Sequence, residues 1–384
     1  MSKSTKYGIY CYDTENIGDE IQSVAAKRFL PQIDYYINRD NIDATKFKPN
    51  EKVKLIMNGW YLEKSQKDCK THWPPRNPNI SPLLTSVHIS FLNGSLETFN
   101  TPSSHTFLKK YAPIGARDYA TKEYLESIGI PSYFSGCLTL TLLPDKRIKK
   151  SNFVLAVDVD PKVLQAMQKR TSRHIIAVNT IHNGDYTIEE RFDLAMYWLY
   201  LYQSAHCIVT PRLHAMLPGL AFDTPVIALT GRDTERFSGL IELTNHYSPS
   251  EFIKNSKISI DQPAKNPTNF YSIRDSLIQT CSDYTKFDSK TSFLGKLTLQ
   301  ELFNKPSFIS AITKTIEDSF NKKHIYLQQQ KEISQLHDEI DRLNTLIAEK
   351  DATILDLTNP GIKKSFNQLK ESVKNYSHKK LGKH

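Results

Sequence analysis

An arginine and a histidine two residues apart carry the clearest chemical signal in the sequence. They stand in AHCIVTPRLHAMLPGLAFDTPVIAL (residues 205–229), where an apolar strand at 206–210 leads into Arg212 and His214 and then into a helix. In parallel α/β sheets, ligands collect at the carboxyl ends of strands, beside helix N-termini that favour anions. Arginine can hold an oxyanion, and histidine can transfer a proton near neutral pH. The pair suits an anionic substrate that must be protonated, although a surface ion pair and a helix cap would explain the same residues.

A second arginine has a similar position in the first half of the chain. Arg117 follows the apolar residues 114–116 at the end of an expected strand, and Asp118 or Thr121 is placed to cap the next helix. We therefore expect Arg117 to point into the same kind of crevice as Arg212. A structural arginine–aspartate pair is the alternative.

The loop after the first expected strand contains Asn16, Gly18 and Asp19. Glycine permits a close backbone approach, while asparagine and aspartate suit tight turns and helix caps. The loop is therefore either a substrate-contacting βα loop or a well-formed turn without a further role.

Common cofactor and hydrolase motifs are absent: the sequence has no GxGxxG, Walker-type phosphate loop, HExxH or GxSxG. Asp158 and Asp160 resemble the acidic pair that binds a metal in many nucleotide-sugar glycosyltransferases. They follow a strand and precede Pro161, so the start of a helix explains both. The five cysteines are scattered without CxxC spacing. We expect no metal site and a reduced, cytoplasmic protein.

Short apolar strands alternate with helical patterns through the first 260 residues, which predicts βα units and parallel sheets. The expected strands lie at residues 7–12, 53–57, 87–91, 114–116, 153–157, 174–178, 206–210 and 225–229. The expected helices lie at residues 19–30, 121–128, 161–169, 191–204 and 213–222. A polar, basic stretch at 143–152 divides two domains, at residues 1–147 and 148–323. Residues 248–304 show no clear period and receive no assignment.

From residue 326 the hydrophobic period changes to seven. The a positions are Tyr326, Ile333, Ile340, Ile347 and Ile354, and the d positions are Gln329, Leu336, Leu343, Lys350 and Leu357. Isoleucine at a with leucine at d favours a parallel two-stranded coiled coil. We expect a rod at 324–358 that forms a homodimer, with a long helix packed on its own domain as the alternative.

The tail at residues 359–384 is basic and amphipathic, with Ile362, Phe366, Leu369, Val373 and Tyr376 on one helical face. It suits an anionic membrane surface or a solvated, frayed end. Residues 361–384 hold seven lysines and one glutamate, so most of the net charge of +9 lies there. The rest of the chain is nearly balanced, and nucleic acid is not an expected partner.

The longest apolar stretch, residues 194–202, is too short for a bilayer span, which needs about 20 residues. The N-terminus lacks the apolar segment of a secretion signal. We expect a cytoplasmic location, with peripheral contact at the inner face of the cell membrane through the tail.

Several of these stretches, in this order, resemble the polysaccharide pyruvyl transferase family. The resemblance covers about the first 240 residues: the Asn16 loop, GARDYATKEYLESIGI, SGCLTLTL, and residues 181–229 with VTPRLHA and TPVIAL. It implies an α/β, glycosyltransferase-B-like fold, with two Rossmann-like domains facing across a cleft. It also implies ketal formation, with phosphoenolpyruvate as donor, a sugar diol as acceptor and no cofactor.

The resemblance also implies roles for single residues. The RLH motif of the family maps onto Arg212 and His214, its GxRD arginine onto Arg117, and a further histidine onto His182. The arginines would hold phosphoenolpyruvate, and His214 would donate a proton or act as the base. Asn58 stands where relatives often have a glycine pair, a departure that concerns the acceptor pocket.

Two other functions compete with pyruvyl transfer. A glycosyltransferase of the same architecture would bind a nucleotide-sugar diphosphate, and Arg212 would serve that phosphate equally well. A non-catalytic scaffold would use the coiled coil and the tail to tether surface-polymer machinery at a membrane. Arg117, Arg212 and His214 argue against a scaffold, because a scaffold needs no residues that bind an anion and donate a proton. The acceptor sugar, its linkage and its attachment to a lipid are left open.

Overall fold

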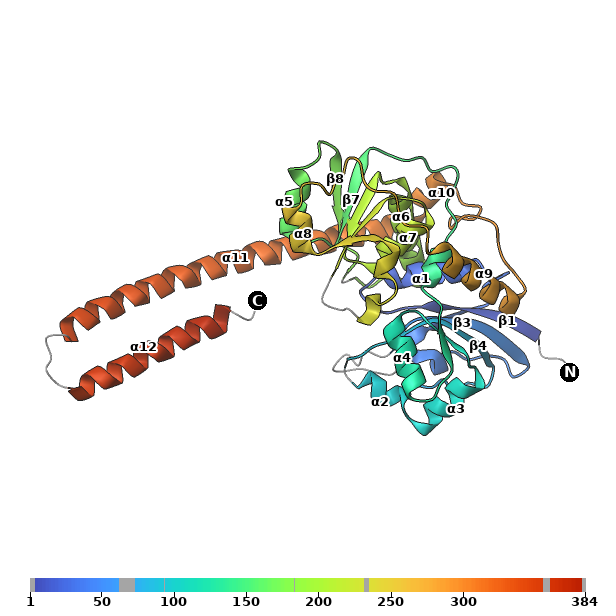
Figure 1. Ribbon diagram of the computed structural model, residues 1–384, viewed down its shortest axis with the longest axis horizontal. Coiled ribbons are helices and arrows are strands. Elements are labelled where there is room, and N and C mark those ends of the chain that lie inside the picture. Colours follow the sequence, from blue (N-terminus) through green and yellow to red (C-terminus); the bar gives the residue numbers. More distant parts are fainter. Residues whose placement is uncertain are drawn as a thin grey trace. The chain divides into compact units, whose positions relative to one another are not determined.

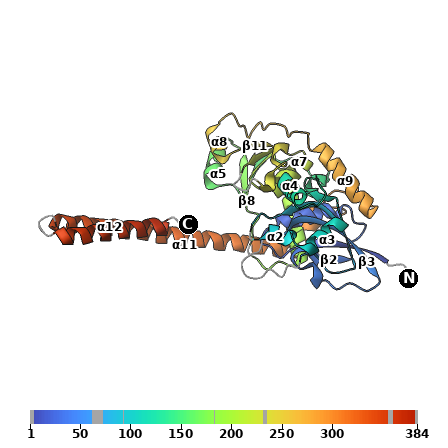
Figure 2. The ribbon, with the colours of Figure 1, turned by 60° about the horizontal axis from the view of Figure 1, so that its bottom comes forward.

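The computed structural model describes residues 4–61, 73–92, 94–182, 184–230, 235–354 and 360–381. The chain divides into two compact units, Met1–Thr315 and Ile316–His384. The first unit holds two parallel β-sheets flanked by helices (Figures 1 and 2).

The first sheet has six strands in the order β2-β1-β3-β4-β5-β6, and every pairing is parallel. The strands are β1 Ser4–Cys11, β2 Tyr35–Asn38, β3 Glu51–Tyr61, β4 Ile80–Ile89, β5 Ile114–Ala116 and β6 Ser132–Phe134. The α-helices are α1 Gly18–Lys27, α2 Ser95–Phe99, α3 Pro102–Lys110 and α4 Tyr119–Ser127, and short 3-10 helices span Arg39–Ala44 and Leu138–Thr141. In Figure 1, α1 lies on one side of this sheet and α2, α3 and α4 lie on the other.

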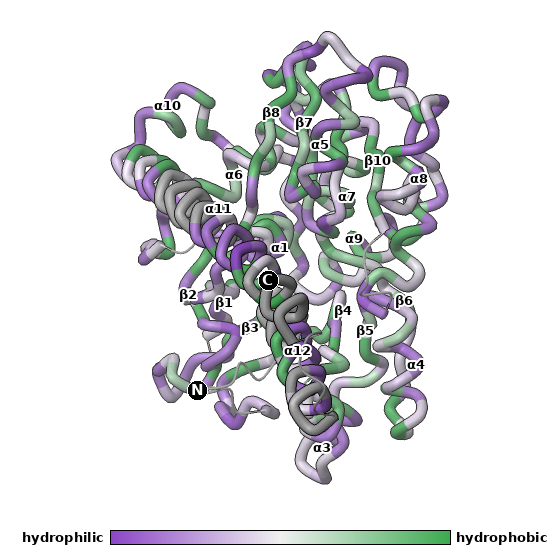
Figure 3. The backbone as a smooth tube through the Cα atoms, turned by 90° about the vertical axis from the view of Figure 1, so that its left-hand side faces the viewer, coloured by the Kyte–Doolittle hydropathy of each residue, from purple (hydrophilic) through white to green (hydrophobic). Residues whose placement is uncertain are grey.

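The second sheet has five parallel strands in the order β11-β10-β9-β7-β8. Its strands are β7 Phe153–Val157, β8 His174–Val178, β9 Cys207–Thr210, β10 Val226–Leu229 and β11 Asn245–Tyr247. Its helices are α5 Pro161–Gln168, α6 Ile188–Ser204, α7 Leu213–Ala221 and α8 Pro249–Lys254, with 3-10 helices at Glu235–Phe237 and Ile241–Leu243. The strands β7 and β10 are mostly hydrophobic (Figure 3), as expected of strands buried on both faces.

Successive residues of the strands enter different cores. In β1, Ile9 packs into a core shared with α1, whereas Tyr10 packs into a core on the opposite face of the sheet. In β7, Leu155 belongs to the same core as Ile9, and Ala156 faces a third core. This alternation follows from the period of two in a β-strand. The core of Ile9 and Leu155 therefore joins the two sheets.

A buried ion pair connects α1 to α6 within this shared core. Glu20 accepts hydrogen bonds from Nε and Nη2 of Arg191, at 2.5 and 3.0 Å. The two side chains are only 1% and 6% exposed. A bidentate pair of this kind fixes orientation as well as distance, so it determines where Gly18, the first residue of α1, lies.

Replacement of Arg191 by methionine is expected to lower the free energy of unfolding by about 3–5 kcal/mol, because Glu20 stays buried without its partner. Methionine fills a similar volume, so the loss reports the charge rather than a cavity. Chemical denaturation measures the difference, with the exposed Arg76 replaced by methionine as the control. A loss below about 1 kcal/mol would contradict the expectation.

The segment after the second sheet returns to the first half of the unit. In α9 (Tyr271–Thr285), the Tyr284 hydroxyl accepts the N–H of Leu55 in β3 at 2.9 Å. Asp288 then pairs with Arg28, which follows α1, at 2.6 Å from Nε to Oδ1. Short helix α10 (Leu299–Phe303) precedes α11 (Pro306–Ile354). These contacts give structure to residues 248–304, whose sequence has no clear period.

The second unit consists of the later part of α11 and of α12 (Pro360–Leu381). The long helix expected from the heptads is confirmed, but it begins at Pro306, before the first heptad. Leu336 and Leu343, two expected d positions, are 43% and 37% exposed. The following side chains, and all of Leu357, lie outside the described residues: Tyr326, Gln329, Ile333, Lys350, Ile354, Ile362, Phe366 and Tyr376.

Most expected strands and helices of the two sheets are confirmed, and the strands at 114–116, 153–157 and 174–178 have the expected bounds. Strands β2, β6 and β11 and helices α2 and α3 are additional. Asn58 was expected after a strand, but β3 continues to Tyr61 through an irregularity between Met57 and Gly59. None of the described helices is long and apolar enough to cross a membrane.

Candidate functional site

Residues from loops at the carboxyl ends of several strands surround a small cavity. Its volume is about 10 Å³, and it lies within the first unit. Four of the residues expected from the sequence line it: Asn16, Gly18, Arg212 and His214. The other lining residues are Thr180, Tyr202, Leu213 and Arg236. The second sheet supplies most of them, and the first sheet supplies the loop after β1.

Gly18 lies directly against His214. A Cβ atom on Gly18 would lie 3.2 Å from Nδ1 of His214 and 2.9 Å from Oδ1 of Asn16, so a larger residue would displace the histidine. Asn16 Oδ1 accepts the N–H of Gly18 at 2.9 Å and fixes the turn before α1. The N–H of Ile17 donates to the carbonyl of Thr180 at 3.1 Å. The loop after β1 is thereby attached to the loop after β8.

Arg212 is held in place by Asp158. Its Nε donates to Oδ2 of Asp158 at 2.8 Å, and the side chain stays 32% exposed. Asp158 has a left-handed backbone (φ 51°) and also accepts the N–H of Thr180 at 3.1 Å. The expectation that the start of a helix explains both aspartates is therefore wrong for Asp158. Asp160 alone caps α5, accepting the N–H of Lys162 at 2.8 Å.

Arg117 is fully buried at the end of β5. None of its three guanidinium nitrogens has a hydrogen-bond partner among the described residues, and Asp118 Oδ2 lies 3.5 Å from its Nε. Asp118 is engaged elsewhere: it caps α4 by accepting the N–H of Thr121 at 2.9 Å, and it bonds to Nδ1 of His88 at 2.6 Å. Buried charged groups are normally hydrogen-bonded. A guanidinium without acceptors therefore marks a place for an anionic ligand.

Two further residues of this cluster, His88 and Arg236, were not expected from the sequence. Burial and the charge of Arg117 lower the pKa of His88 to about 4, although Asp118 opposes the shift. A neutral His88 donates its Nδ1 proton to Asp118. The ring of Trp60 packs edge-on against His88, with centroids 5.1 Å apart, and the Arg236 guanidinium lies 4.5 Å above the Trp60 ring. His88 lies near the carboxyl end of β4, which is a weak signal in the sequence, whereas Arg236 lies in a 3-10 helix and its sequence position gives no such signal.

Positive charge surrounds His214, which is 7% exposed. Burial lowers the pKa of His214 well below its ordinary value, and Arg117, Arg236, Arg212 and Arg39 lower it further. Its Nε2 has no hydrogen-bond partner within the described ranges. In the free protein His214 is therefore a neutral imidazole in the field of four arginines.

Four expected site residues are not among those that line the cavity: Arg117, described above, and Asp19, Asn58 and His182. Asp19 forms an ion pair with Arg39, with 3.5 Å between Oδ2 and Nη1. Asn58 is 1% exposed and donates to a backbone carbonyl of α1 at 3.2 Å. His182 stacks on Trp198, with ring centroids 6.0 Å apart and an angle of 3° between the planes. Each side chain supports an element of the site in this structure, and their roles toward a substrate stay predictions.

The sequence matches the family described as polysaccharide pyruvyl transferase over residues 16–233. This range is more than half of the 384 residues and contains Asn16, Arg117, Arg212 and His214. The chain belongs to this family. No curated protein matches the sequence.

Solved structures with a similar arrangement are distant from this pyruvyl transferase family member. An uncharacterised protein from Klebsiella pneumoniae has 12% identity and a TM-score of 0.39, over 63% of this chain and 93% of its own. The UDP-GlcNAc 2-epimerase of Methanocaldococcus jannaschii has 10% identity and a TM-score of 0.36, over 73% and 98%. The wall teichoic acid polymerase TagF has 10% identity and a TM-score of 0.30, over 85% and 90%. At these TM-scores the likeness carries no argument about function.

The residues around the cavity include hydrogen-bond donors that could serve an anion. Tyr202 is fully buried, and its hydroxyl has no hydrogen-bond partner among the residues described. Burial and the charge of Asp158 raise the pKa of Tyr202, so the hydroxyl stays protonated. Among all the residues that the structure describes, no group of three His, Cys, Asp or Glu side chains is arranged to hold a metal ion. Guanidinium groups, a phenol and a neutral imidazole can bind an anion and exchange a proton with it.

Proposed function

We propose that the chain transfers the pyruvyl group of phosphoenolpyruvate to a sugar of a cell-surface polysaccharide or its lipid-linked precursor, forming a pyruvate ketal. The observation that carries the proposal is the buried Arg117 guanidinium, which has no hydrogen-bond partner among the described residues and whose charge acts on His214. Phosphoenolpyruvate has a phosphate and a carboxylate, and guanidinium groups bind both in a bidentate manner. Membership of the family supports the same reaction.

In the proposed reaction, His214 gives a proton to the methylene carbon of phosphoenolpyruvate, which makes C2 electrophilic. A sugar hydroxyl adds to C2 and returns a proton to His214. The bond from C2 to the phosphate oxygen then breaks, with its electron pair leaving on the phosphate, and a second hydroxyl closes the ketal. One hydroxyl proton ends on the new methyl group and the other on the released phosphate. Arg117 and Arg212 hold the donor, Tyr202 donates a hydrogen bond to it, and His182 supports the histidine site from the loop after β8.

Donor binding is expected to take up a proton near neutral pH. Burial and the surrounding arginines hold the pKa of His214 well below its ordinary value in the free protein. The negative charges of the donor offset the arginines and raise this pKa, so more of His214 is protonated in the complex. Titration calorimetry in buffers of different ionisation enthalpy measures the uptake, and binding should strengthen as the pH falls. Proton release on binding would contradict this account.

The test of the proposed donor is a titration of phosphoenolpyruvate into the wild-type protein and into Arg212→Ala. Loss of one charge-assisted contact weakens binding by about 1.5–3 kcal/mol, which is roughly ten- to hundredfold. Arg76→Ala is the control, because Arg76 is exposed and its side chain has no described partner. Wild-type binding that the control keeps and Arg212→Ala loses would support the donor.

The same titration separates the competing functions. Binding of a nucleotide sugar without binding of phosphoenolpyruvate would favour glycosyl transfer, since arginines also suit a diphosphate. Binding of neither compound would favour a scaffold. Release of inorganic phosphate in the presence of a sugar acceptor would then be absent as well.

We extend the proposal to architecture and partners. Residues 1–147 and 148–323 would form Rossmann-like domains facing across a cleft, in the glycosyltransferase-B-like manner. The two parallel sheets support this assignment. The rod at 324–358 would form a homodimer, and the lysine-rich tail would contact the anionic inner face of the membrane. The helices α11 and α12 support a helical rod and a helical tail. The homodimer and the membrane contact stay predictions.

A further inference from the structure

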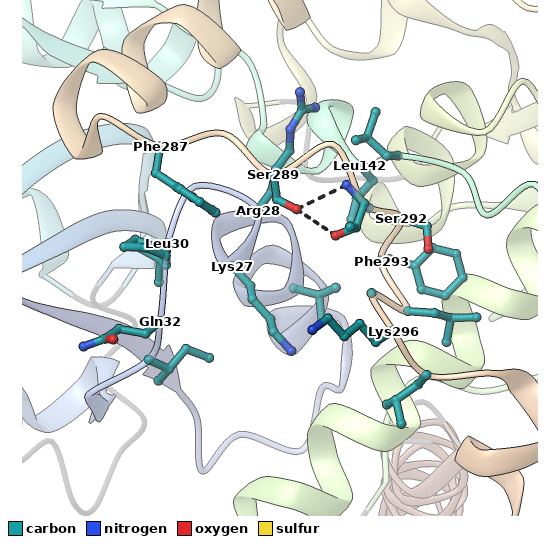
Figure 4. Close-up of a pocket in the computed structure, with 18 of the residues that line it drawn as sticks. Lys27, Arg28, Leu30, Gln32, Leu142, Phe287, Ser289, Ser292, Phe293 and Lys296 are labelled. Atoms are coloured by element: carbon teal, nitrogen blue, oxygen red, sulfur yellow. Dashed lines mark hydrogen bonds between the residues drawn. The ribbon is translucent and has the colours of Figure 1, made fainter.

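A second pocket of the first unit lies at the C-terminal end of α1, the end opposite Gly18, and Figure 4 shows residues that line it. Its volume is about 660 Å³, within the range of about 300–1,000 Å³ that small-molecule sites occupy. The pocket is built from the C-terminal end of α1, the chain after it, Leu142 and Leu143 between the sheets, and the loop at residues 287–297. Since α1 has ten residues that rise 1.5 Å each, the pocket lies roughly 14 Å from Gly18.

The walls of this pocket are largely apolar. Leu30, Leu142, Phe287 and Phe293 line it, and Figure 4 shows them on different sides of the space. Phe293 and Leu142 also belong to the core that joins the two sheets, so this part of the wall is rigidly supported. An apolar body of moderate size can therefore bury its surface here.

Two lysines line the same pocket without partners. Lys27 and Lys296 have exposed side chains that extend into the pocket in Figure 4, and neither forms a hydrogen bond or an ion pair with any residue that the structure describes. Partial desolvation of the Lys27 ammonium group and the charge of Lys305 lower the pKa of Lys27, with a smaller opposing effect of Asp193. An anion beside Lys27 would relieve this repulsion.

The other charged groups at the pocket are already neutralised or occupied. Arg28 donates from Nε and Nη2 to Asp288, at 2.6 and 3.1 Å. Glu301 accepts the N–H and hydroxyl of Thr298 in a capping box, at 2.7 and 2.9 Å. Lys27 and Lys296 are therefore the cations that remain available, against a single engaged carboxylate.

We propose that this pocket binds an amphiphilic phosphate monoester, with its apolar body on the leucine and phenylalanine walls and its phosphate at Lys27 and Lys296. The charge of the two lysines selects an anion, and the walls select an apolar body over free phosphate. The site is separate from the arginine cluster and does not depend on the reaction proposed there.

Titration calorimetry with hexyl phosphate, hexanol and inorganic phosphate tests the proposal on the full-length protein. Hexyl phosphate is expected to bind at least about tenfold more tightly than either of the other two, because only it satisfies both the walls and the lysines. The variant Lys27→Met/Lys296→Met should weaken hexyl phosphate binding at least about tenfold, since methionine keeps the apolar contacts and removes the charges. Lys254→Met, at an exposed position of α8, is the matched control.

Lysine acetylation followed by mass spectrometry gives the location of binding. Hexyl phosphate is expected to slow the acetylation of Lys27 and Lys296 and to leave that of Lys254 unchanged. The same protection should appear in Arg212→Ala, which removes the competing anion site. Unchanged affinity in the double lysine variant, unprotected lysines, or hexanol binding as tightly as hexyl phosphate would overturn the proposal.

Discussion

Replacing Arg117 by methionine is expected to raise the free energy of unfolding by about 1–3 kcal/mol, the usual cost of a buried hydrogen-bonding group without a partner. Arg117 is fully buried, and its guanidinium nitrogens have no hydrogen-bond partner in the described chain. Methionine fills a similar volume without the cost of a buried, unsatisfied charge. Asp118, whose Oδ2 lies 3.5 Å from Nε of Arg117, loses this nearby charge but keeps its hydrogen bonds to His88 and to the N–H of Thr121. Chemical denaturation of the free protein measures the gain.

The same substitution should lower the rate of pyruvyl transfer by about 10²- to 10³-fold, because a positioned donor to the anionic substrate is lost. Arg191→Met is the matched comparison, since Arg191 is also buried but pairs with Glu20. The two variants should change stability in opposite directions. A destabilised Arg117→Met would show that the guanidinium has a structural role, and it would remove the main support for an anion site.

The parts of the fold that the sequence predicts well are strands buried on both faces. Residues 153–157 are a continuous apolar run in the interior of the second sheet, and they become a strand with the expected bounds. Residues 174–178 also have the expected bounds, although β8 is an edge strand and its residues are only partly buried or exposed. β2, β6 and β11 escape prediction because they are edge strands with only four, three and three residues, too few to show a period. Asn58 and Gly59 follow the expected strand at 53–57, but they form an irregular part of β3, which continues to Tyr61 between its neighbouring strands.

Some features of the site can likewise be predicted from the local sequence, and others depend on contacts between distant residues. Arg117, Arg212 and His214 stand directly after strands, where the position alone predicts access to a ligand. The partner of Arg212 is Asp158, which is 54 residues away in the sequence. No local pattern shows that Asp158 pairs with this arginine instead of capping the helix that follows it. Arg236 reaches the cavity after the chain folds over Trp60. Such relations depend on tertiary packing and cannot be obtained from spacing.

Replacing His214 by alanine is expected to reduce kcat by about 10²- to 10⁴-fold, which is the usual contribution of a general acid–base group. Its Nε2 has no partner in the described structure and so is available to the substrate. Binding of phosphoenolpyruvate should change far less, because the surrounding arginines remain. His246→Ala, at an exposed histidine of β11, is the control. Near-normal turnover of the His214 variant would refute the assignment.

The proton balance distinguishes this role from a loss of shape at the site. If His214 is the group whose pKa rises when the donor binds, the proton uptake seen in the wild-type protein must disappear in His214→Ala. Gly18 lies against the His214 ring, so the variant opens space that water can fill without replacing the titrating group. Uptake that persists in the variant would assign the proton to another group, even if the rate falls as expected.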